Sequence, residues 1–302
     1  MQEFNPSKIK QEDLIQVRKT DLGLSDSEVF VFSLNNEDYV LKLFGKNGYP
    51  SNEAAALKLL NSLEKSYVPE LIYFDKRGKY FSKPAVITRK MGGVRADEWL
   101  ASAAEPKYYW DLYIKRVTDF YSSLTQIGVG KPFSSLAKES FIKYGDSFNM
   151  HIMRGLEIFG APCLKAKIFN DLHFTRIQNQ LNVALACLDN KYNFCFGDTL
   201  LKNSLVYEDD IIVLDWEYAH FGHRFRDWGS FIVDIFRGND CLDDARKLSE
   251  RFCSLVGIES KELKPFALYR CVVEAGALLY ANLPEEASKI AKISHKIGQN
   301  LN

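Results

Sequence analysis

Short apolar runs separated by polar turns predict a small antiparallel sheet in the first ninety residues. Residues 28–34 and 38–44 are apolar segments on either side of a polar turn at 35–37, which is the pattern of a β-hairpin. Two further strands are expected at 70–74 and 84–89. This part of the chain therefore favours strands that pair with their neighbours in sequence.

One helix is expected within this strand-rich region. It begins after Pro50 and Ser51, and its apolar positions recur at i, i+3, i+4 and i+7, which places them on one helical face. Those positions are Ala56, Leu59, Leu60 and Leu63.

The pattern changes from strand to helix at Gly92 and Gly93. Long helical periods follow, and the rest of the chain is predicted to be mostly helical. One β-rich segment at residues 194–217 interrupts the helices, with apolar strands around the polar turn at 208–210. The apolar positions of the two clearest helices are Trp110, Ile114, Val117, Tyr121 and Leu124, and then Ile177, Leu181, Ala184, Leu185 and Leu188.

These elements define an α+β fold with two lobes. A small antiparallel β lobe with one key helix is predicted for residues 1–91, and a larger, mainly helical lobe for residues 92–302. No Pro- or Ser-rich linker and no internal repeat occurs, so we expect the lobes to be tightly hinged around a cleft.

The composition narrows the expected localisation of the protein and the classes of partner that it could bind. Its 302 residues are 46% hydrophobic and 26% charged, which is typical of a globular protein. Lys and Arg together number 39, as do Asp and Glu, so no overall field attracts nucleic acid or anionic lipid. No stretch reads as a signal peptide or a membrane span. We expect a cytoplasmic protein with no nucleic-acid partner and no membrane insertion, while the oligomeric state stays open.

Several kinds of site lack sequence support. The six cysteines stand singly and the five histidines form no metal-binding spacing, so neither a zinc site nor a redox dithiol is indicated. No G-x-S-x-G segment occurs, which removes the main support for a serine hydrolase.

Three residues of the β-rich segment carry the strongest chemical signal. Asp198 is followed five residues later by Asn203, and Asp215 ends the next apolar strand twelve residues after that. This spacing matches a kinase catalytic loop, in which one Asp acts as base and the other two residues bind Mg2+ through hard oxygen atoms. Any one of them alone could be an ordinary turn or strand-end residue, so the combination carries the hypothesis.

A lysine and a glutamate upstream fit the same chemistry. Lys42 lies within the apolar strand at 38–44, where its ammonium could reach the α and β phosphates of a nucleotide. Glu53 lies in the first turn of the helix after Pro50 and could pair with Lys42. The alternatives are a solvated strand lysine and a glutamate that interacts with the helix N-terminus.

The segment at residues 21–27 could cover the nucleotide phosphates. Its backbone N–H groups and the hydroxyls of Ser25 and Ser27 are suitable donors. Because the segment has a single glycine, Gly23, it is not a G-x-G-x-x-G loop, and an ordinary turn is the alternative interpretation.

Taken in order, these residues resemble the aminoglycoside phosphotransferase and choline kinase superfamily, over about residues 15–235. That superfamily has a bilobal, protein kinase-like fold, and it commonly reads H-G-D-x-x-x-x-N, then I-D-(W/F)-E-Y-A, then D-(L/I/W)-(A/G). The segments that carry the resemblance are Phe196-Gly197-Asp198 with Asn203, then Leu214-Asp215-Trp216-Glu217-Tyr218-Ala219, then Arg226-Asp227-Trp228-Gly229.

The resemblance implies a role for each lobe and for each position. It implies that the lobe at residues 1–91 binds the nucleotide and that the lobe at residues 92–302 holds the catalytic loop and the acceptor site. It implies that Asp198 is the catalytic base, that Asn203 and Asp215 bind Mg2+, and that ATP or GTP is the co-substrate. The remaining implied roles are phosphate anchoring by Lys42 and Glu53, support of the catalytic loop by Asp227, and main-chain contact with the nucleotide base by the hinge from Arg89 to Met91.

Two departures from the superfamily pattern leave a rival interpretation open. Phe196 replaces the usual His, although an apolar ring can fill the same packing role. Leu200 stands where His or Lys is common, so one polar contributor near the phosphate is missing. With the glycine-poor loop, these departures suggest a weakly active or inactive nucleotide-binding pseudokinase or regulatory module as the alternative to a kinase.

The acceptor is expected to be a small molecule rather than a protein. Asp215-Trp216-Glu217 replaces D-F-G, and the short distance to Asp227 leaves no room for a peptide-docking activation loop. The resemblance implies a choline-, ethanolamine- or thiamine-like amino alcohol, an aminoglycoside or a sugar. Carboxylates that could contact a cationic acceptor include Glu217, Asp234 and Glu274.

Overall fold

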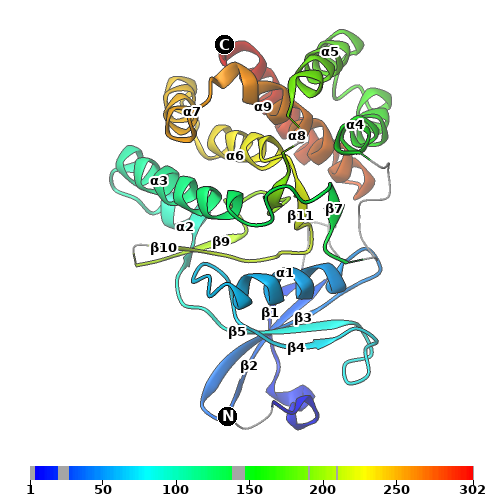
Figure 1. Ribbon diagram of the computed structural model, residues 1–302, viewed down its shortest axis with the longest axis vertical. Coiled ribbons are helices and arrows are strands. Elements are labelled where there is room, and N and C mark those ends of the chain that lie inside the picture. Colours follow the sequence, from blue (N-terminus) through cyan, green and yellow to red (C-terminus); the bar gives the residue numbers. More distant parts are fainter. Residues whose placement is uncertain (1–3, 20–26, 138–146, 190, 209, 302) are drawn as a thin grey trace. The chain divides into compact units, whose positions relative to one another are not determined.

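The computed structural model describes residues 4–19, 27–137, 147–189, 191–208 and 210–301. The chain divides into two compact units, each of which is drawn in Figure 1. The first takes in the described residues within 1–94, 135–141 and 205–219, and the second takes in those within 95–134, 142–204 and 220–302. The first is built on antiparallel strands and the second is mostly helical, so the predicted α+β class is confirmed.

The main sheet of the first unit has five antiparallel strands in the order β1-β2-β3-β5-β4. The predicted hairpin is confirmed, and Leu34 pairs with Glu37 across a two-residue turn. Both turn residues, Asn35 and Asn36, have positive φ, which suits the right-handed twist of the flanking strands and which Asn tolerates well. The elements are two short 3-10 helices, Pro6–Lys8 and Gln11–Asp13, and the strands β1 (Ile15–Lys19), β2 (Glu28–Leu34), β3 (Glu37–Leu43), β4 (Leu71–Asp75) and β5 (Ala85–Arg89).

Strand β3 separates the core of this unit from its polar face. Tyr39, Leu41 and Leu43 alternate along the strand and are buried in one hydrophobic cluster. Successive side chains of a strand point to opposite faces, so Lys42 points away from that cluster. The alternation of β3 thus determines on which face of the sheet the Lys42 ammonium lies.

Helix α1 (Pro50–Ser62) packs against β4 and β5 (Figure 1). The helix itself is confirmed, but its predicted apolar face was partly wrong. Leu63 lies just beyond the helix and is 45% exposed. The buried face instead runs through Glu53, Ala56, Leu57 and Leu60. Each of these lies three residues before a predicted position, so the buried face includes a glutamate.

A second, smaller sheet has the order β10-β9-β6. Its strands are β6 (Val94–Arg95), β9 (Ser204–Tyr207) and β10 (Asp210–Val213). Gly93 has a φ of 119°, and a Cβ atom there would lie 2.8 Å from the carbonyl oxygen of Val206. A glycine is therefore needed where the chain enters this sheet.

The second unit is arranged around a long helix, α8 (Ser260–Tyr280), which contacts α4, α5, α6 and α9. Strands β7 (Ser134–Ser135), β11 (His220–Gly222) and β8 (Asn193–Cys195) form a small sheet in the order β7-β11-β8. The other helices are α2 (Ala96–Ala101), α3 (Pro106–Thr125), α4 (Phe148–Lys165), α5 (Asp171–Cys187), α6 (Phe225–Gly238), α7 (Leu242–Val256) and α9 (Pro284–Asn300).

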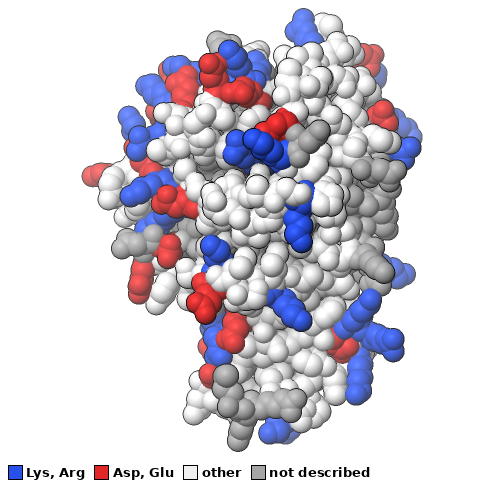
Figure 2. Space-filling model, viewed as in Figure 1, with Lys and Arg blue, Asp and Glu red and all other residues white. Residues whose placement is uncertain are grey.

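The predicted helical periods correspond to buried faces. The five predicted apolar positions of α3 are all buried. On α5, Ile177, Leu181 and Leu185 are buried, while Ala184 and Leu188 are half-buried. Within the described chain, no helix is both long and apolar enough to cross a membrane. Basic and acidic side chains lie intermixed on the face shown in Figure 2, in agreement with their equal totals.

His151 of α4 makes the stability of this fold sensitive to acid. The residue is 5% exposed and packs against the ring of Phe133 at 5.4 Å between centroids. Burial, and to a lesser extent Arg226, lowers the pKa of His151 to about 3. The unfolded state therefore binds a proton from about pH 6.5 downwards while the folded state does not.

We expect this histidine to contribute to acid unfolding. Its contribution to stability is fully present above its unfolded pKa and is lost as the pH falls below about 6.5. His151→Leu should flatten the decline in the free energy of unfolding between pH 7 and pH 4, as measured by urea denaturation. Met150→Leu changes an exposed side chain of the same helix that does not titrate, so it should keep the wild-type decline. Equal slopes for the two variants would contradict this account.

Candidate active site

The ammonium of Lys42 lies among three carboxylates of the first unit. Its Nζ is 2.8 Å from Glu53 Oε2, 2.6 Å from Asp215 Oδ1 and 3.8 Å from Glu217 Oε1. Only 12% of the Lys42 side chain is exposed, and its Nζ also lies 4.6 Å from the centre of the Phe44 ring. Residues from β3, α1 and the segment after β10 thus converge on one cation.

Burial and neighbouring charges shift the pKa values of these groups in opposite directions. Burial favours the neutral form of Lys42, but Asp215, Glu53 and Glu217 hold the pKa of Lys42 well above its usual range. Burial raises the pKa of Glu217 to about 8 although Lys42 opposes it. The Glu53 pKa is raised for the same reason. The lysine is therefore a permanent cation surrounded by more acidic groups than it can neutralise.

Asp215 has a backbone conformation that is unusual for a residue with a side chain. It follows β10 with a φ of 61°, in the left-handed region that Asp and Asn enter more readily than other residues. Such strain is of the order of 1 kcal/mol and clusters at functional sites. The turn brings the Asp215 carboxylate back onto Lys42 while 31% of the side chain stays exposed.

Asn52 holds the Asp215–Ala219 segment against helix α1. It is fully buried, and its Nδ2 donates hydrogen bonds to the carbonyl oxygens of Glu217 and Ala219, at 2.9 and 2.7 Å. Its Oδ1 accepts hydrogen bonds from the backbone N–H groups of Leu136 and Ala137. Sequence reasoning missed this residue, because its partners lie 84 to 167 residues away along the chain.

Asn52→Ala should therefore destabilise the first unit. The substitution removes four hydrogen bonds and leaves buried backbone groups without their partner, so we expect a loss of about 3 kcal/mol in the free energy of unfolding. Asn61→Ala is a matched control on the same helix, since Asn61 makes two such bonds, to Pro69 and Leu71. Urea denaturation of both variants tests this, and an equal or smaller loss for Asn52→Ala would refute the role.

Asp198 of the second unit is held by two side chains. Its Oδ1 accepts a hydrogen bond from Arg270 Nη2 at 2.7 Å, and its Oδ2 accepts one from Asn203 Nδ2 at 3.0 Å. Gly197, just before it, has a φ of 87°, a conformation that favours glycine at this position. The structure thus brings Asp198 and Asn203 together and adds Arg270, a residue of α8, as a partner of the carboxylate.

The loop around Asp198 rests on the carboxylate of Asp227. The backbone N–H groups of Phe196 and Gly197 donate to Asp227 at 2.6 and 2.9 Å. Burial raises the pKa of Asp227 to about 6, against the effect of Arg226. Phe196 and Leu200, the two departures from the superfamily pattern, are both fully buried, so apolar packing accounts for them locally.

A buried chain of alternating charges continues behind this loop. Asp234 accepts hydrogen bonds from the backbone N–H groups of Leu200 and Leu201 at 2.9 and 3.0 Å, and its other oxygen accepts one from Arg237 at 3.1 Å. Arg237 also donates to Glu274 at 2.6 Å. Glu274 in turn lies 3.8 Å from Arg270, the partner of Asp198.

Two of the residues that were predicted to contact the acceptor, Asp234 and Glu274, belong to this buried network. Asp234 has no exposed surface, so in this structure it supports the catalytic-loop backbone instead of facing an acceptor. Glu274 is bound between Arg237 and Arg270, whose charges lower its pKa although burial opposes them. Glu217, the third, is also buried and accepts a hydrogen bond from the Tyr49 N–H at 3.1 Å. All three carboxylates are engaged by the chain itself.

Arg270 and Arg237 were missed in the sequence, although a signal was present. Arg270 stands in the otherwise apolar run Leu268-Tyr269-Arg270-Cys271-Val272-Val273, and Glu274 follows it by one helical turn. A charged pair at i, i+4 on an apolar helix indicates a buried ion pair. What such a pair contacts cannot be read from the helix alone.

The remaining predicted site residues lie at the edge of the first unit. Arg89 ends β5 and pairs with Glu37 and Glu70, both at 2.8 Å. Its backbone N–H donates to the Glu70 carbonyl and that of Lys90 donates to the Asp38 carbonyl, so both groups are used within the sheet. Met91 follows and is half-buried. Ser27 is buried at the start of β2, whereas Ser25 lies outside the described residues.

The side chains present suit a hard divalent cation. Asp215 supplies carboxylate oxygens and Asn203 an amide oxygen, which are the donor types that Mg2+ prefers. Among the described residues, no three His, Cys, Asp or Glu side chains form a metal-binding cluster. Each unit thus contains one residue whose donor type suits Mg2+, Asp215 in the first and Asn203 in the second.

Comparison with known proteins identifies the fold. A thermostable mutant of the aminoglycoside phosphotransferase APH(4)-Ia superimposes with a TM-score of 0.66 at 15% identity, covering 95% of both chains. The same protein is also known in a ternary complex with AMP-PNP and hygromycin B, with a TM-score of 0.65 at 15% identity over 95% of this chain and 94% of that one. A choline/ethanolamine kinase family protein from Mesorhizobium loti gives a TM-score of 0.61 at 16% identity, over 94% and 91% of the two chains. The chain has the aminoglycoside phosphotransferase and choline kinase-like fold, and the predicted resemblance is confirmed.

Sequence comparison finds similarity to a kinase. Methylthioribose kinase 2 from Oryza sativa subsp. japonica is 24% identical in an alignment of 201 residues that covers 61% of this chain and 44% of that protein. The chain thus spans less than half the length of this curated relative. No protein-family model matches the chain.

Proposed function

We propose that this protein is a Mg2+-dependent phosphotransferase that transfers the γ-phosphate of ATP or GTP to a hydroxyl group of a small molecule. The observation that carries the proposal is the Lys42 ammonium held by Glu53 and Asp215. Phosphoryl transfer needs a fixed cation beside the nucleotide phosphates and a carboxylate for the metal, and this cluster supplies both. The shared fold and the kinase relative support the same conclusion.

Each residue then has one task. Lys42 neutralises charge on the nucleotide phosphates, and Glu53 holds its ammonium in place. Asn203 and Asp215 would bind Mg2+, which neutralises charge that develops on the phosphate oxygens during transfer. Asp198 accepts the proton of the acceptor hydroxyl as the new O–P bond forms and the bond from the γ-phosphorus to the bridging oxygen breaks, releasing the nucleoside diphosphate. Arg270 orients the Asp198 carboxylate, and Asp227 and Asp234 hold the loop that carries it.

The acceptor class is proposed from the relatives. The names of the matched proteins point to a sugar, an aminoglycoside or a choline- or ethanolamine-like amino alcohol. All of these offer a hydroxyl group to a base. Because Glu217, Asp234 and Glu274 are engaged by the chain, we propose that other groups bind the acceptor.

Thermal unfolding combined with an assay for nucleoside diphosphate release tests this function. ATP or GTP with Mg2+ should stabilise the protein, by about 2.7 kcal/mol at one hundred times the dissociation constant. Methylthioribose, hygromycin B and choline are then added as acceptors, and one of them should produce diphosphate. Lys42→Met should abolish the nucleotide effect, and Lys83→Met, which removes an exposed ion pair with Glu28, should retain it.

The outcomes separate the two interpretations. Stabilisation by nucleotide without transfer to any acceptor would favour the pseudokinase alternative. If neither nucleotide stabilises the wild-type protein at millimolar concentration, the proposed nucleotide site is refuted.

A further inference from the structure

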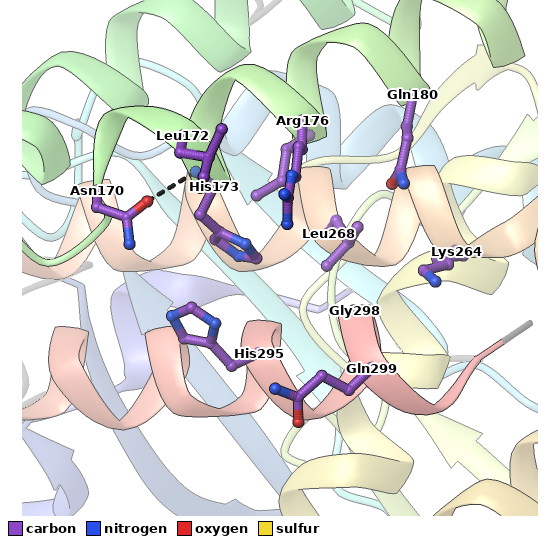
Figure 3. A pocket seen from close by; sticks show the side chains of 11 residues that line it. Asn170, Leu172, His173, Arg176, Gln180, Lys264, Leu268, His295, Gly298 and Gln299 are labelled. Carbon is purple, nitrogen blue, oxygen red and sulfur yellow. Dashed lines mark hydrogen bonds between the residues drawn. The ribbon is translucent and has the colours of Figure 1, made fainter.

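A cavity of about 270 Å³ lies between helices α5, α8 and α9 of the second unit (Figure 3). It is smaller than the range of about 300–1,000 Å³ that is typical of sites for drug-sized ligands, so its size suits a small metabolite. The residues that line it are Asn170, Leu172, His173, Arg176, Ile177, Gln180, Lys264, Leu268, His295, Gly298 and Gln299.

The polar lining of this cavity is basic and neutral. His173, Arg176, Lys264 and His295 line it together with three carboxamide side chains, and none of the lining residues is acidic. Among the described residues, no Asp or Glu forms an ion pair with Arg176 or Lys264. Their charges are therefore available to an anion from outside the chain.

The local electrostatics agree with this composition. Burial, followed by the nearby His295 and Arg176, lowers the pKa of His173 to about 4. Burial also lowers the pKa of Lys264. The His173 ring is held by stacking on His295, with ring centres 4.2 Å apart, and its Nε2 lies 3.1 Å from Ser294 Oγ. The His173 ring thus forms a fixed wall that carries no charge at neutral pH, and the cationic side chains of the lining are Arg176 and Lys264.

The cavity lies on a different face of α8 from the candidate catalytic loop. Arg270 of that helix contacts Asp198. Leu268 precedes Arg270 by two residues and Lys264 precedes it by six, which correspond to rotations of about 200° and 240° around the helix axis. A ligand in the cavity is therefore separate from the groups proposed for phosphotransfer.

We propose that this cavity binds a small phosphate monoester. The planar guanidinium of Arg176 suits paired hydrogen bonds to phosphate oxygens, and the Lys264 ammonium adds a point charge. The carboxamides of Gln180 and Gln299 can hydrogen-bond to hydroxyl groups on the rest of the ligand. Figure 3 shows these two side chains on opposite walls of the cavity. This binding does not depend on the proposed kinase activity.

Isothermal titration calorimetry of the 302-residue protein tests the site. The probes are ribose 5-phosphate, inorganic phosphate, ribose and citrate. We expect ribose 5-phosphate to bind, inorganic phosphate to bind with equal or lower affinity, and ribose to give no heat of binding. Arg176→Gln and Lys264→Gln should each weaken the affinity for ribose 5-phosphate about tenfold, since each removes one charge-assisted contact.

A third variant fills the cavity without changing its charge. A Cβ atom on Gly298 would lie 3.7 Å from the His173 ring, an ordinary contact, so the longer side chain of Gly298→Met should occupy the cavity and prevent binding. Gly298→Ala is its control and should bind. Arg154→Gln, at an exposed arginine of α4 outside the lining, and Lys42→Met, in the proposed nucleotide site, should both leave the affinity unchanged.

Three results would overturn the proposal. The first is that ribose 5-phosphate does not bind at millimolar concentration. The second is that Arg176→Gln, Lys264→Gln and Gly298→Met all bind it with wild-type affinity. The third is that citrate binds more tightly than both phosphates. Loss of binding in Lys42→Met alone would assign the probe to the nucleotide site instead.

Discussion

Asp198→Asn is expected to lower kcat about 10³-fold for the acceptor that the screen identifies, while nucleotide binding persists. The amide cannot accept the acceptor's proton, but its size and its ability to accept a hydrogen bond from Arg270 remain. Because Lys42, Glu53 and Asp215 belong to the other unit, the nucleotide contacts proposed for them are unaffected. Steady-state kinetics and nucleotide-induced thermal stabilisation provide the two measurements.

Asp111→Asn is the matched control for this variant. Asp111 lies in the same unit and forms an exposed ion pair with Arg251 at 2.7 Å. Since an exposed pair of this kind contributes about 0–1 kcal/mol, the variant should keep both stability and turnover. Undiminished turnover in Asp198→Asn would remove Asp198 from the mechanism. Loss of nucleotide stabilisation together with turnover would indicate a folding defect instead.

Arg237→Met is expected to destabilise the protein by about 3–5 kcal/mol. Arg237 is the cation between Asp234 and Glu274, and without it these two buried carboxylates lose the cation that they share, while only Arg270 remains, 3.8 Å from Glu274. Asp234 also holds the backbone N–H groups of Leu200 and Leu201, so the loop should loosen as the network fails. Urea denaturation at pH 7.5 measures the loss.

The defect of Arg237→Met should shrink in acid. Burial already raises the pKa of Asp234 to about 6 in the wild-type protein, against the effect of Arg237. Removing the arginine raises the folded-state pKa of both carboxyl groups above their wild-type values, so the folded variant binds more protons than the folded wild-type protein as the pH falls. The difference in the free energy of unfolding between variant and wild type should therefore narrow from pH 7.5 to pH 5.

Arg246→Met serves as the control, because Arg246 pairs with Glu250 on the surface of α7 at 3.0 Å. It should lose no more than about 1 kcal/mol at either pH. A deficit of Arg237→Met that matches this control, or one that stays constant with pH, would show that the buried network does not depend on Arg237.

Much of the fold could be predicted because it depends on neighbours along the chain. The hairpin at Glu28–Leu43 follows from two apolar segments and an Asn-Asn turn whose backbone suits left-handed φ. Helix α3 follows from an apolar period that is wholly buried in the structure. The apolar face of α1 was partly misassigned, because Glu53 is buried by its contact with Lys42, and hydrophobicity alone does not indicate that.

The candidate site likewise contains contacts that could be predicted from the sequence and contacts that could not. The pairing of Lys42 with Glu53 was expected from motif order and spacing, and this contact is present in the structure. The hydrogen bond between Asp198 and Asn203 was not predicted. The contacts of Asn52 and Arg270 were not expected. Asn52 binds residues up to 167 positions away, and Arg270 lies 72 positions from Asp198. A local sequence pattern does not predict contacts between residues that are so far apart along the chain.

The sequence by itself determined the α+β class, the hairpin at 28–43, the helical period of α3 and the residue types of a candidate phosphotransfer site, because periodicity and motif spacing are local properties of the chain. Only the tertiary structure decided which charges are buried together. Asp234 and Glu274 became supports of the loop because the faces of α6 and α8 meet there, and burial requires that each carboxylate find a cation or an N–H group. The basic cavity likewise exists only because α5, α8 and α9 bring their cations together without an acidic residue among them.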